Sequence, residues 1–506
     1  SVFSRDDAFH YFKIARSIAA GHGATFDGIH ATSGVQFLWT GFLIPLAWVF
    51  DDPVTYLRAV LFLCIALNLI AAFLFARLCR IAHSDTLAGI ALILWAGVLA
   101  ERWNTLQGME YSLHIVILLE TAIVAWRFFT DRDWTLSLVL GVLLALNFWT
   151  RLDSLVVSAA LWLLAVAVVL RRADRGAARI AALTLPGLIA AALYIAVFQA
   201  MAGTPLPLSG SVKSWYAERY FQDVSTATAI LEQLRMWAKI QVSGVLALVP
   251  SVLVEIGLAE TFNPFSKPQH LATALMFMAG TGLIALRLLR PSPDRHLMLA
   301  GAFGLAVAGL QSAAAVVVMK SFAPVSYHYY ALHLIVWIIL GGCLILSLVR
   351  LMPASVRRPA AAVLTIANAV PYALIANGFL SATPDVMNYA VARLRLAADL
   401  NRTLPPGAIV GAWNAGVLGY FLDRPVVNLD GLVNDRAFLA VLRAESPLID
   451  YLRAENIGWL VDHNKQDLTL RFGERRDTTT DFRNGIPWTA LQPVTRLGDV
   501  QVLRVR

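Results

Sequence analysis

Charged residues are scarce in this sequence, and cysteines are scarcer still. Asp, Glu, Lys and Arg make up 15% of the 506 residues, while 58% are hydrophobic. Soluble globular chains carry about 25% charged and about 45–50% apolar residues, so the composition excludes an ordinary soluble protein. The three cysteines (Cys64, Cys79 and Cys343) lie in or beside apolar runs without metal-type spacing, and we expect no disulfide framework.

The net charge of +8 does not indicate a nucleic-acid partner. Arg residues gather at the ends of apolar runs, as the positive-inside bias of membrane proteins predicts. The sequence begins with Ser1 rather than Met. We expect that an N-terminal helix is missing before it.

Ten apolar runs are candidate membrane spans, because each approaches the roughly 20 residues that a bilayer requires. They cover residues 54–80, 85–100, 112–129, 133–150, 153–171, 178–201, 270–286, 297–319, 330–350 and 359–381. The short loops that carry Arg clusters are expected in the cytoplasm. The sequence therefore predicts a polytopic α-helical membrane protein, whose residues after about 383 lie on the other side.

Three further apolar stretches do not fit this alternation as spans. Residues 37–50 and 8–20 are predicted to form helices in the membrane interface, the former anchored by Trp39 and Trp48. Residues 241–260 are predicted to be re-entrant or peripheral. The first external loop then covers residues 1–53.

The pattern changes near residue 383. A polar helix at 385–402 precedes short apolar runs of strand length at 408–412 and 425–429. Helical stretches at 435–443 and 447–454 alternate with them, which predicts a small soluble α/β domain. We therefore divide the chain into a transmembrane domain, residues 1–382, and an extracytoplasmic domain, residues 383–506.

Two adjacent acids, Asp6 and Asp7, stand in the stretch "SRDDAFHYFKIARSIAAGHGATFDG" near the start of the chain. One aspartate at this place can cap the following helix. A pair is harder to explain by capping, because neighbouring like charges repel each other. The pair is therefore a candidate for chemistry.

The acid pair, the "IARSIAAGHGATFDG" stretch and the later "GVQFLW" resemble the first external loop of the GT-C superfamily of polyprenyl-phosphate-dependent membrane glycosyltransferases. Within that superfamily, the stretch most resembles the bacterial branch that includes the mycobacterial terminal arabinofuranosyltransferases. Many relatives carry "TSPLW" or "HPLW" where this chain has "VQFLW". The resemblance implies a GT-C fold in a bacterial cytoplasmic membrane, a polyprenyl-phosphate sugar donor, and a cell-envelope glycan or lipid acceptor outside.

The resemblance aligns Asp6 with the base that receives the acceptor proton, and Asp7 with a residue that holds the acceptor or a cation. The chemistry of the reaction independently requires only one base. A lipid phosphate leaves readily, so the reaction requires no general acid, unlike most glycosidases. The expected outcome is a single inverting displacement.

The donor phosphate requires cations. Lys213, in the stretch "TPLPLSGSVKSWY", is the strongest candidate, and Arg151 is a second. Arg151 can instead pair with Asp153 or extend toward the headgroups at its helix end. His328 is a third candidate, although an aromatic belt explains "SYHYYALHL" equally plainly.

Four residues are candidates for sugar or acceptor binding: Glu110, Tyr329, Asn428 and Asp430. Glu110 can alternatively be an acid that favours the N-terminus of the following helix. Asn428 and Asp430 stand at a strand end, and can alternatively be polar caps of the α/β core. Trp413 is expected to belong to that core.

A divalent cation is an alternative ligand of this region, because His10 and His22 stand near Asp6 and Asp7. Their spacing matches no standard metal site, and we assign no metal. Two other classes of function stay open. A transporter or flippase would place ionisable residues near the middle of its spans, and a carbohydrate-binding scaffold would not require Asp6.

Overall fold

The fold is described from a computed structural model of the chain. It describes residues 6–97, 107–131, 133–172, 176–220, 225–231, 233–235, 237, 295–319, 331–353, 355–356, 359, 384–463, 486, 488–497 and 500–506.

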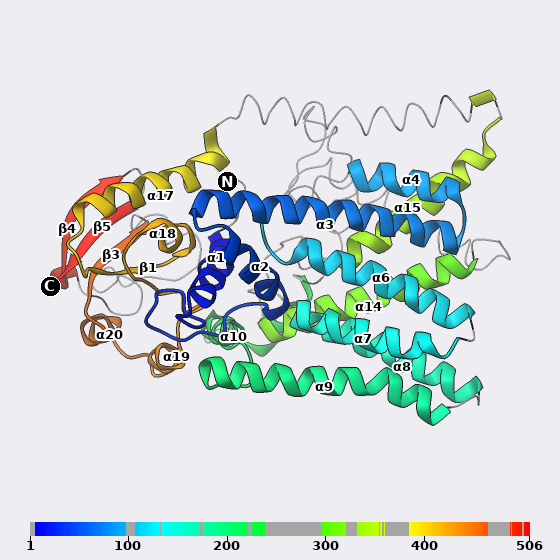
Figure 1. The fold of residues 1–506 in the computed structure, drawn as a ribbon, viewed down its shortest axis with the longest axis horizontal. Coiled ribbons are helices and arrows are strands. Elements are labelled where there is room, and N and C mark those ends of the chain that lie inside the picture. Colours follow the sequence, from blue (N-terminus) through cyan, green and yellow to red (C-terminus); the bar gives the residue numbers. More distant parts are fainter. Residues whose placement is uncertain are drawn as a thin grey trace.

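Long helices that run side by side make up most of the chain before residue 384 (Figure 1). They are α3 (Pro53–Ala82), α4 (Asp85–Gly97), α6 (Tyr111–Thr130), α7 (Thr135–Thr150), α8 (Leu155–Arg172), α9 (Gly176–Ala202), α14 (Arg295–Met319) and α15 (Ala331–Leu351), with the 3-10 turn η1 (Leu152–Ser154) before α8. By length and composition, four of the described helical segments can cross a membrane: Pro53–Ala82, Tyr111–Thr130, Leu152–Arg172 and Gly176–Ala202. The chain is a multi-pass α-helical membrane protein.

Eight of the predicted spans coincide with these helices, which confirms that they are helical. The spans predicted at 270–286 and 359–381, and the stretch 241–260, lie outside the described residues apart from residue 359. The starts of α3, α6 and α8 lie at the same end of the bundle as the ends of α7 and α9 (Figure 1). That end adjoins the C-terminal domain, so loop residues there can contribute to one site.

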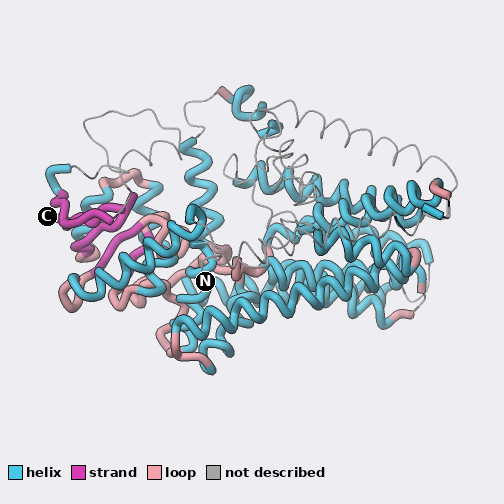
Figure 2. The backbone as a smooth tube through the Cα atoms, turned by 90° about the horizontal axis from the view of Figure 1, so that it is seen from above, coloured by secondary structure: helices cyan, strands magenta, loops and turns pink. Residues whose placement is uncertain are grey.

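The C-terminal domain is α/β, as the sequence predicts. Its elements are α17 (Pro384–Thr403), β1 (Ile409–Ala412), α18 (Gly416–Phe421), β2 (Val426–Asn428), α19 (Arg436–Arg443), α20 (Leu448–Ala454), β3 (Ile457–His463), η3 (Trp488–Ala490), β4 (Leu491–Leu497) and β5 (Val500–Val505). Figure 2 shows the strands gathered at one end of the molecule, with the long helices running away from them.

The five strands have the order β2-β1-β3-β5-β4. β1 is parallel to both β2 and β3, while β5 is antiparallel to its two neighbours. From β1 the chain moves to one side, to β2, and then crosses to the other side, to β3. In open α/β sheets such a reversal creates a crevice at the carboxyl ends of the strands, where ligands commonly bind.

The N-terminal helices α1 (Asp6–Ala19) and α2 (Phe37–Val49) lie between the bundle and the C-terminal domain (Figure 1). The helix predicted at residues 8–20 is present as α1, and its apolar residues are buried within the protein. Phe9, Phe12 and Ile14 are at most 1% exposed and share one hydrophobic core with Leu418 of α18. The apolar side of α1 is therefore buried against protein, not against lipid.

The two tryptophans of α2 differ in environment. Trp39 is fully buried, and its indole Nε1 donates a hydrogen bond to the Gly108 carbonyl, so it is a core residue and not an interfacial anchor. Trp48 is 66% exposed, and its Nε1 donates to the Ala19 carbonyl. An exposed indole with a satisfied N–H fits the predicted anchor.

Helix α10 (Leu208–Tyr220) follows α9 and reaches the C-terminal domain. Leu208, Val212 and Trp215 are buried in one cluster with Trp413 and Leu429, which flank the carboxyl ends of β1 and β2. Lys213 follows Val212 directly, so this packing places Lys213 at the same end of the sheet. Trp413 is 2% exposed, in agreement with its predicted place in the core.

Candidate functional site

Asp6 is bonded to the C-terminal domain. Its Oδ2 accepts a hydrogen bond from the Gly416 backbone N–H at 2.8 Å, and its Oδ1 accepts one from Val417 at 3.0 Å. These are the first two residues of α18, whose N–H groups have no partner within the helix. Asp6 therefore caps a helix from a distant part of the chain, and the helix fixes the orientation of its carboxylate.

A glycine makes this contact possible. A Cβ atom on Gly416 would lie 1.9 Å from the backbone oxygen of Asp6. Gly419, one turn later in α18, packs on Phe26, and its Cβ would lie 2.4 Å from the ring. Gly34 likewise approaches the Leu432 carbonyl, with 1.9 Å to a Cβ. At Gly416 and Gly34, the backbones of the first loop and the C-terminal domain are therefore in direct contact.

Burial raises the pKa of Asp6 to about 6, although the Arg393 charge and the two backbone hydrogen bonds act in the opposite direction. Arg393, on α17, is 1% exposed and donates from Nη1 to the Asn414 carbonyl at 2.9 Å. Sequence reasoning missed this residue. The sequence does contain a pattern that could have revealed Arg393. It stands three, four and seven residues before Leu396, Ala397 and Leu400, so it lies on the buried face of the same helix.

Asp7 begins a second group of polar residues. His10 follows it by one turn of α1, so the two side chains share a face of the helix. His10 is 4% exposed, and the ring of Phe26 meets its imidazole edge-on at 5.0 Å. Burial lowers the pKa of His10, and the charges of Asp7, Asp430 and Lys213 all act on its ring.

Three distant segments thus converge near His10: α1, the loop after β2, and α10. Val212 of α10 packs against Gly431 in the loop after β2, where a Cβ atom would lie 3.3 Å from the Val212 methyl group. Lys213 is the next residue of α10. Lys213 and Asp430, both predicted from the sequence, therefore belong to the same neighbourhood as the acid pair.

Asp430 ties together the carboxyl ends of β1 and β2. Its Oδ2 accepts hydrogen bonds from the Asn414 backbone N–H at 2.6 Å and from the Asn428 side chain at 3.4 Å. Asn414 has a positive φ of 47°, which an asparagine tolerates better than most residues. Asn428 is 1% exposed, and its Oδ1 accepts from the Leu432 N–H. Asn428 thus shapes the loop that presents Asp430.

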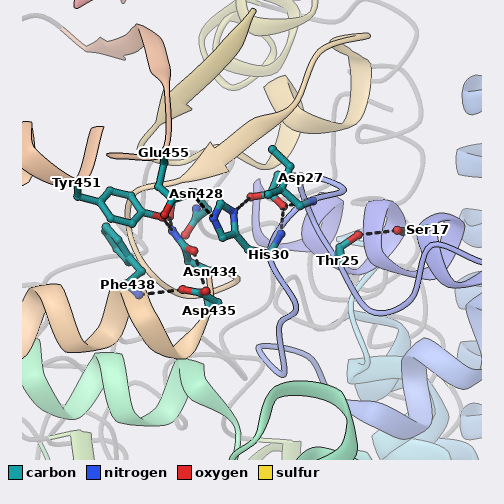
Figure 3. Close-up of polar contacts among 11 residues, drawn as sticks. Ser17, Thr25, Asp27, His30, Asn428, Asn434, Asp435, Phe438, Tyr451 and Glu455 are labelled. Carbon is teal, nitrogen blue, oxygen red and sulfur yellow. Dashed lines mark hydrogen bonds and ion pairs between the residues drawn. The ribbon is translucent and has the colours of Figure 1, made fainter. Parts of the chain in front are cut away.

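A charged group links the first loop to the C-terminal domain near Asn434 and Asp435 (Figure 3). His30 Nδ1 lies 2.6 Å from Asp27 Oδ2, and His30 Nε2 lies 3.3 Å from Glu455 Oε2. Burial disfavours charge on the His30 ring, but the hydrogen bonds and charges of Asp27, Asp435 and Glu455 outweigh it and raise the pKa of His30 to about 9. Sequence reasoning missed this contact, because its partners are 425 residues apart.

Glu110 and Arg151 form a buried ion pair. Arg151 Nη1 lies 2.5 Å from Glu110 Oε1, and both side chains are at most 3% exposed. Arg151 also contacts Asp153 through Nε at 3.0 Å. Gln311 of α14 donates to the same Asp153 carboxylate. The structure thus favours the stated alternative for Arg151, a local pair, over a phosphate site. Glu110 belongs to this pair and stands at the N-cap position of α6.

His328 and Tyr329 lie outside the described residues. In the described part of the chain, no group of three or more His, Cys, Asp or Glu side chains is arranged to hold a metal ion.

Residues 386–499 match the model of a family described as "Domain of unknown function (DUF8728)". No curated protein matches the chain by sequence. The fold is similar to the apo oligosaccharyltransferase of Archaeoglobus fulgidus, with 11% identity, 91% of this chain and 66% of that chain covered, and a TM-score of 0.49. The chain thus spans slightly less than two thirds of that protein.

It is also similar to ArnT from Cupriavidus metallidurans bound to undecaprenyl phosphate, with 11% identity, 98% and 93% of the two chains covered, and a TM-score of 0.38. At these identities and scores, the likenesses assign neither a family nor an activity to this chain.

Proposed function

We propose that this chain is an inverting glycosyltransferase that moves a sugar from a polyprenyl-phosphate donor to a hydroxyl acceptor at the extracytoplasmic face of a bacterial cytoplasmic membrane. The observation that carries this proposal is that side chains from distant segments lie near one another. Asp7, His10, Lys213 and Asp430 come from three segments, yet the charges of Asp7, Lys213 and Asp430 all act on the His10 ring, and α10 packs at the loop of Asp430 through Val212. Asp6, directly beside Asp7, is held by the same domain. The acid pair of the family-like loop is thus accompanied by the cation that a phosphate donor requires.

Asp6 is the proposed general base. Its carboxylate has about four lone-pair sites, and the two backbone N–H groups use two of them, which leaves capacity to accept a proton. A pKa of about 6 suits this task, because a base works best when its pKa lies near the working pH. The helix cap gives the carboxylate a fixed orientation, and orientation is a large part of general-base efficiency.

Lys213 is the proposed partner of the donor phosphate, while Asp7 and Asp430 hold the acceptor. In the reaction, the acceptor oxygen forms a bond to the anomeric carbon as the bond from that carbon to the phosphate oxygen breaks. The polyprenyl phosphate leaves with the electron pair of the broken bond, and its negative charge is balanced by Lys213. The acceptor proton passes to Asp6. One displacement inverts the anomeric centre.

The remaining predicted site residues take different places in this proposal. Glu110 and Arg151 form a buried pair at the N-caps of α6 and η1, and Tyr11 of α1 also bonds Glu110, so the pair fixes α1 on the bundle. Asn428 orders the loop of Asp430. His328 and Tyr329 stay sequence predictions for the donor phosphate and the acceptor. The acceptor is expected to be a cell-envelope glycan or lipid.

The experiment is a transfer assay on the purified chain in lipid nanodiscs, with a panel of polyprenyl-phosphate pentoses and hexoses and a cell-envelope extract as acceptor. Mass spectrometry of lipids that co-purify with the chain identifies the bound carrier. The proposal expects a co-purified polyprenyl phosphate and sugar transfer from at least one donor. It is abandoned if no donor is consumed and no prenyl phosphate co-purifies.

A further inference from the structure

Among the described residues beside the acid pair, the buried imidazole of His10 has no task in the proposed reaction. The residue is 4% exposed, and within the described part of the chain its Nε2 has no hydrogen-bond partner. A buried polar atom without a partner costs folding free energy, and native proteins contain few of them. Such an atom beside a candidate active site marks a place where a ligand group binds.

The surroundings of His10 hold the ring in place. The imidazole meets the Phe26 ring edge-on, with centroids 5.0 Å apart and planes at 88°. Phe26 is itself anchored, because it packs against Gly419 of α18. The ring of His10 is thus oriented by the same contact that joins the first loop to the C-terminal domain. An oriented donor or acceptor loses little entropy when a ligand binds.

The charges near His10 select the class of ligand. Asp7 and Asp430 carry negative charge and Lys213 carries positive charge, so the sum around a neutral imidazole is negative. This environment disfavours a second anion. Hydroxyl groups suit it, because they donate to carboxylates and can either donate to or accept from an imidazole nitrogen, whichever tautomer is present.

We propose that His10 Nε2, together with the carboxylates of Asp7 and Asp430, binds hydroxyl groups of the acceptor carbohydrate. This inference rests on the proposed function, since it names the acceptor side of the same site. Lys213 then marks the border between the acceptor and the donor phosphate. His10 holds the acceptor while Asp6 receives its proton.

The first test measures carbohydrate binding without any reaction. Saturation-transfer NMR records the binding of methyl arabinofuranoside, methyl mannopyranoside, methyl glucopyranoside and methyl galactopyranoside to the full chain in nanodiscs. Three variants are compared with the wild type: His10→Ala, His10→Gln and His22→Gln. His22 is an exposed histidine of the same loop and serves as the matched control.

We expect binding of at least one glycoside and a loss of about tenfold in affinity in His10→Ala. His10→Gln recovers part of the loss, because an amide also donates and accepts, and His22→Gln matches the wild type. A purely structural role of His10 would not be rescued by glutamine in this graded way. The inference is overturned if no glycoside binds the wild type, or if His10→Ala binds as tightly as the wild type.

The second test separates this inference from the proposed reaction. In a transfer assay, His10→Ala is expected to raise the acceptor KM about tenfold while the donor KM stays within about twofold. An unchanged acceptor KM with active transfer overturns the role of His10 and leaves the reaction standing. Glycoside binding that depends on His10, without any transfer, leaves the carbohydrate site standing and overturns the reaction.

Discussion

Asp6 caps the helix that begins at Gly416, a residue 410 positions further along the chain. The base proposed from the first loop is therefore oriented by the C-terminal domain, which supplies the two N–H groups. The charge of Arg393 in the same domain acts on Asp6, and Arg393 donates to the Asn414 carbonyl, whose own N–H donates to Asp430. The C-terminal domain thus forms part of the proposed active site.

The close approach at Gly416 predicts a large effect of a single methyl group. Gly416→Ala places a Cβ 1.9 Å from the Asp6 backbone oxygen, and relief of such a clash costs about 1–3 kcal/mol. Hydrogen exchange measured by mass spectrometry should show faster exchange in peptides that contain Gly416 and Val417. Gly41→Ala is the control, because this helical glycine has open space around it. Equal exchange in both variants would contradict the close contact.

The ion pairs of His30 predict how stability depends on pH. The pKa of His30 rises from 6.5 in the unfolded chain to about 9 in the fold, so the folded state binds the proton more tightly. A shift of this size corresponds to about 3 kcal/mol, and solvent at the 37% exposed side chain of Glu455 screens it to about 2 kcal/mol. This stabilisation is fully present below pH 6.5 and is lost as pH rises through about 9. Thermal unfolding of the wild type and His30→Gln between pH 6 and pH 10 measures it.

The difference in melting temperature between these two proteins should shrink as the pH rises. His22→Gln is the control, and it should follow the wild type at every pH. A difference that stays constant from pH 6 to pH 10 would show that the His30 charge does not contribute.

The buried pair of Glu110 and Arg151 predicts a strong coupling. Arg151→Gln leaves Glu110 as a buried charge without its partner, at a cost of about 3–5 kcal/mol. Glu110→Gln combined with Arg151→Gln should recover part of that loss, which a double-mutant cycle measures as coupling energy. The exposed pair of Arg127 and Asp131 is the control, and Arg127→Gln should cost less than about 1 kcal/mol. Additive effects at Glu110 and Arg151 would contradict the pair.

Lys213 is predicted to act on the donor. Lys213→Ala removes a charge-assisted bond to phosphate, so the donor KM should rise about tenfold or more while the acceptor KM changes much less. Lys213→Arg retains the charge and should lie between the two. Steady-state kinetics with each substrate varied in turn provide the comparison. An unchanged donor KM in Lys213→Ala would make this lysine a structural residue of α10.

The long apolar helices and the first two C-terminal strands were predictable because each follows from a local pattern. Long apolar runs gave α3, α6 and α9, and the short apolar runs near 408–412 and 425–429 gave β1 and β2. The environment of α1 was not predictable in this way. Its mixture of aromatic and basic residues suits a membrane interface as well as a protein interface, and no local pattern reveals its contact with α18.

The acids of the site were visible in the sequence, while their partners were not. Adjacent Asp6 and Asp7 stand out as a pair, but the cap at Gly416 requires knowledge of a contact across the chain. In the sequence, Arg151 is a second candidate for the phosphate with a local pair to Asp153 as the alternative, and Glu110 is a separate candidate for acceptor binding. Their pairing depends on the packing of α6 against the turn before α8, which no local pattern reveals.

The proposed role of Asp6 is tested most directly by the pH dependence of kcat/KM in the wild type, Asp6→Asn and Asp52→Asn. Asp52 is the matched control, since its carboxylate also caps a helix, by accepting the Thr55 N–H of α3 at 2.7 Å. The account predicts that wild-type kcat/KM rises with pH through about 6, as Asp6 ionises. It also predicts that Asp6→Asn loses about 100-fold or more, while Asp52→Asn stays near the wild type. A wild-type rate in Asp6→Asn, with the same pH profile, would contradict it.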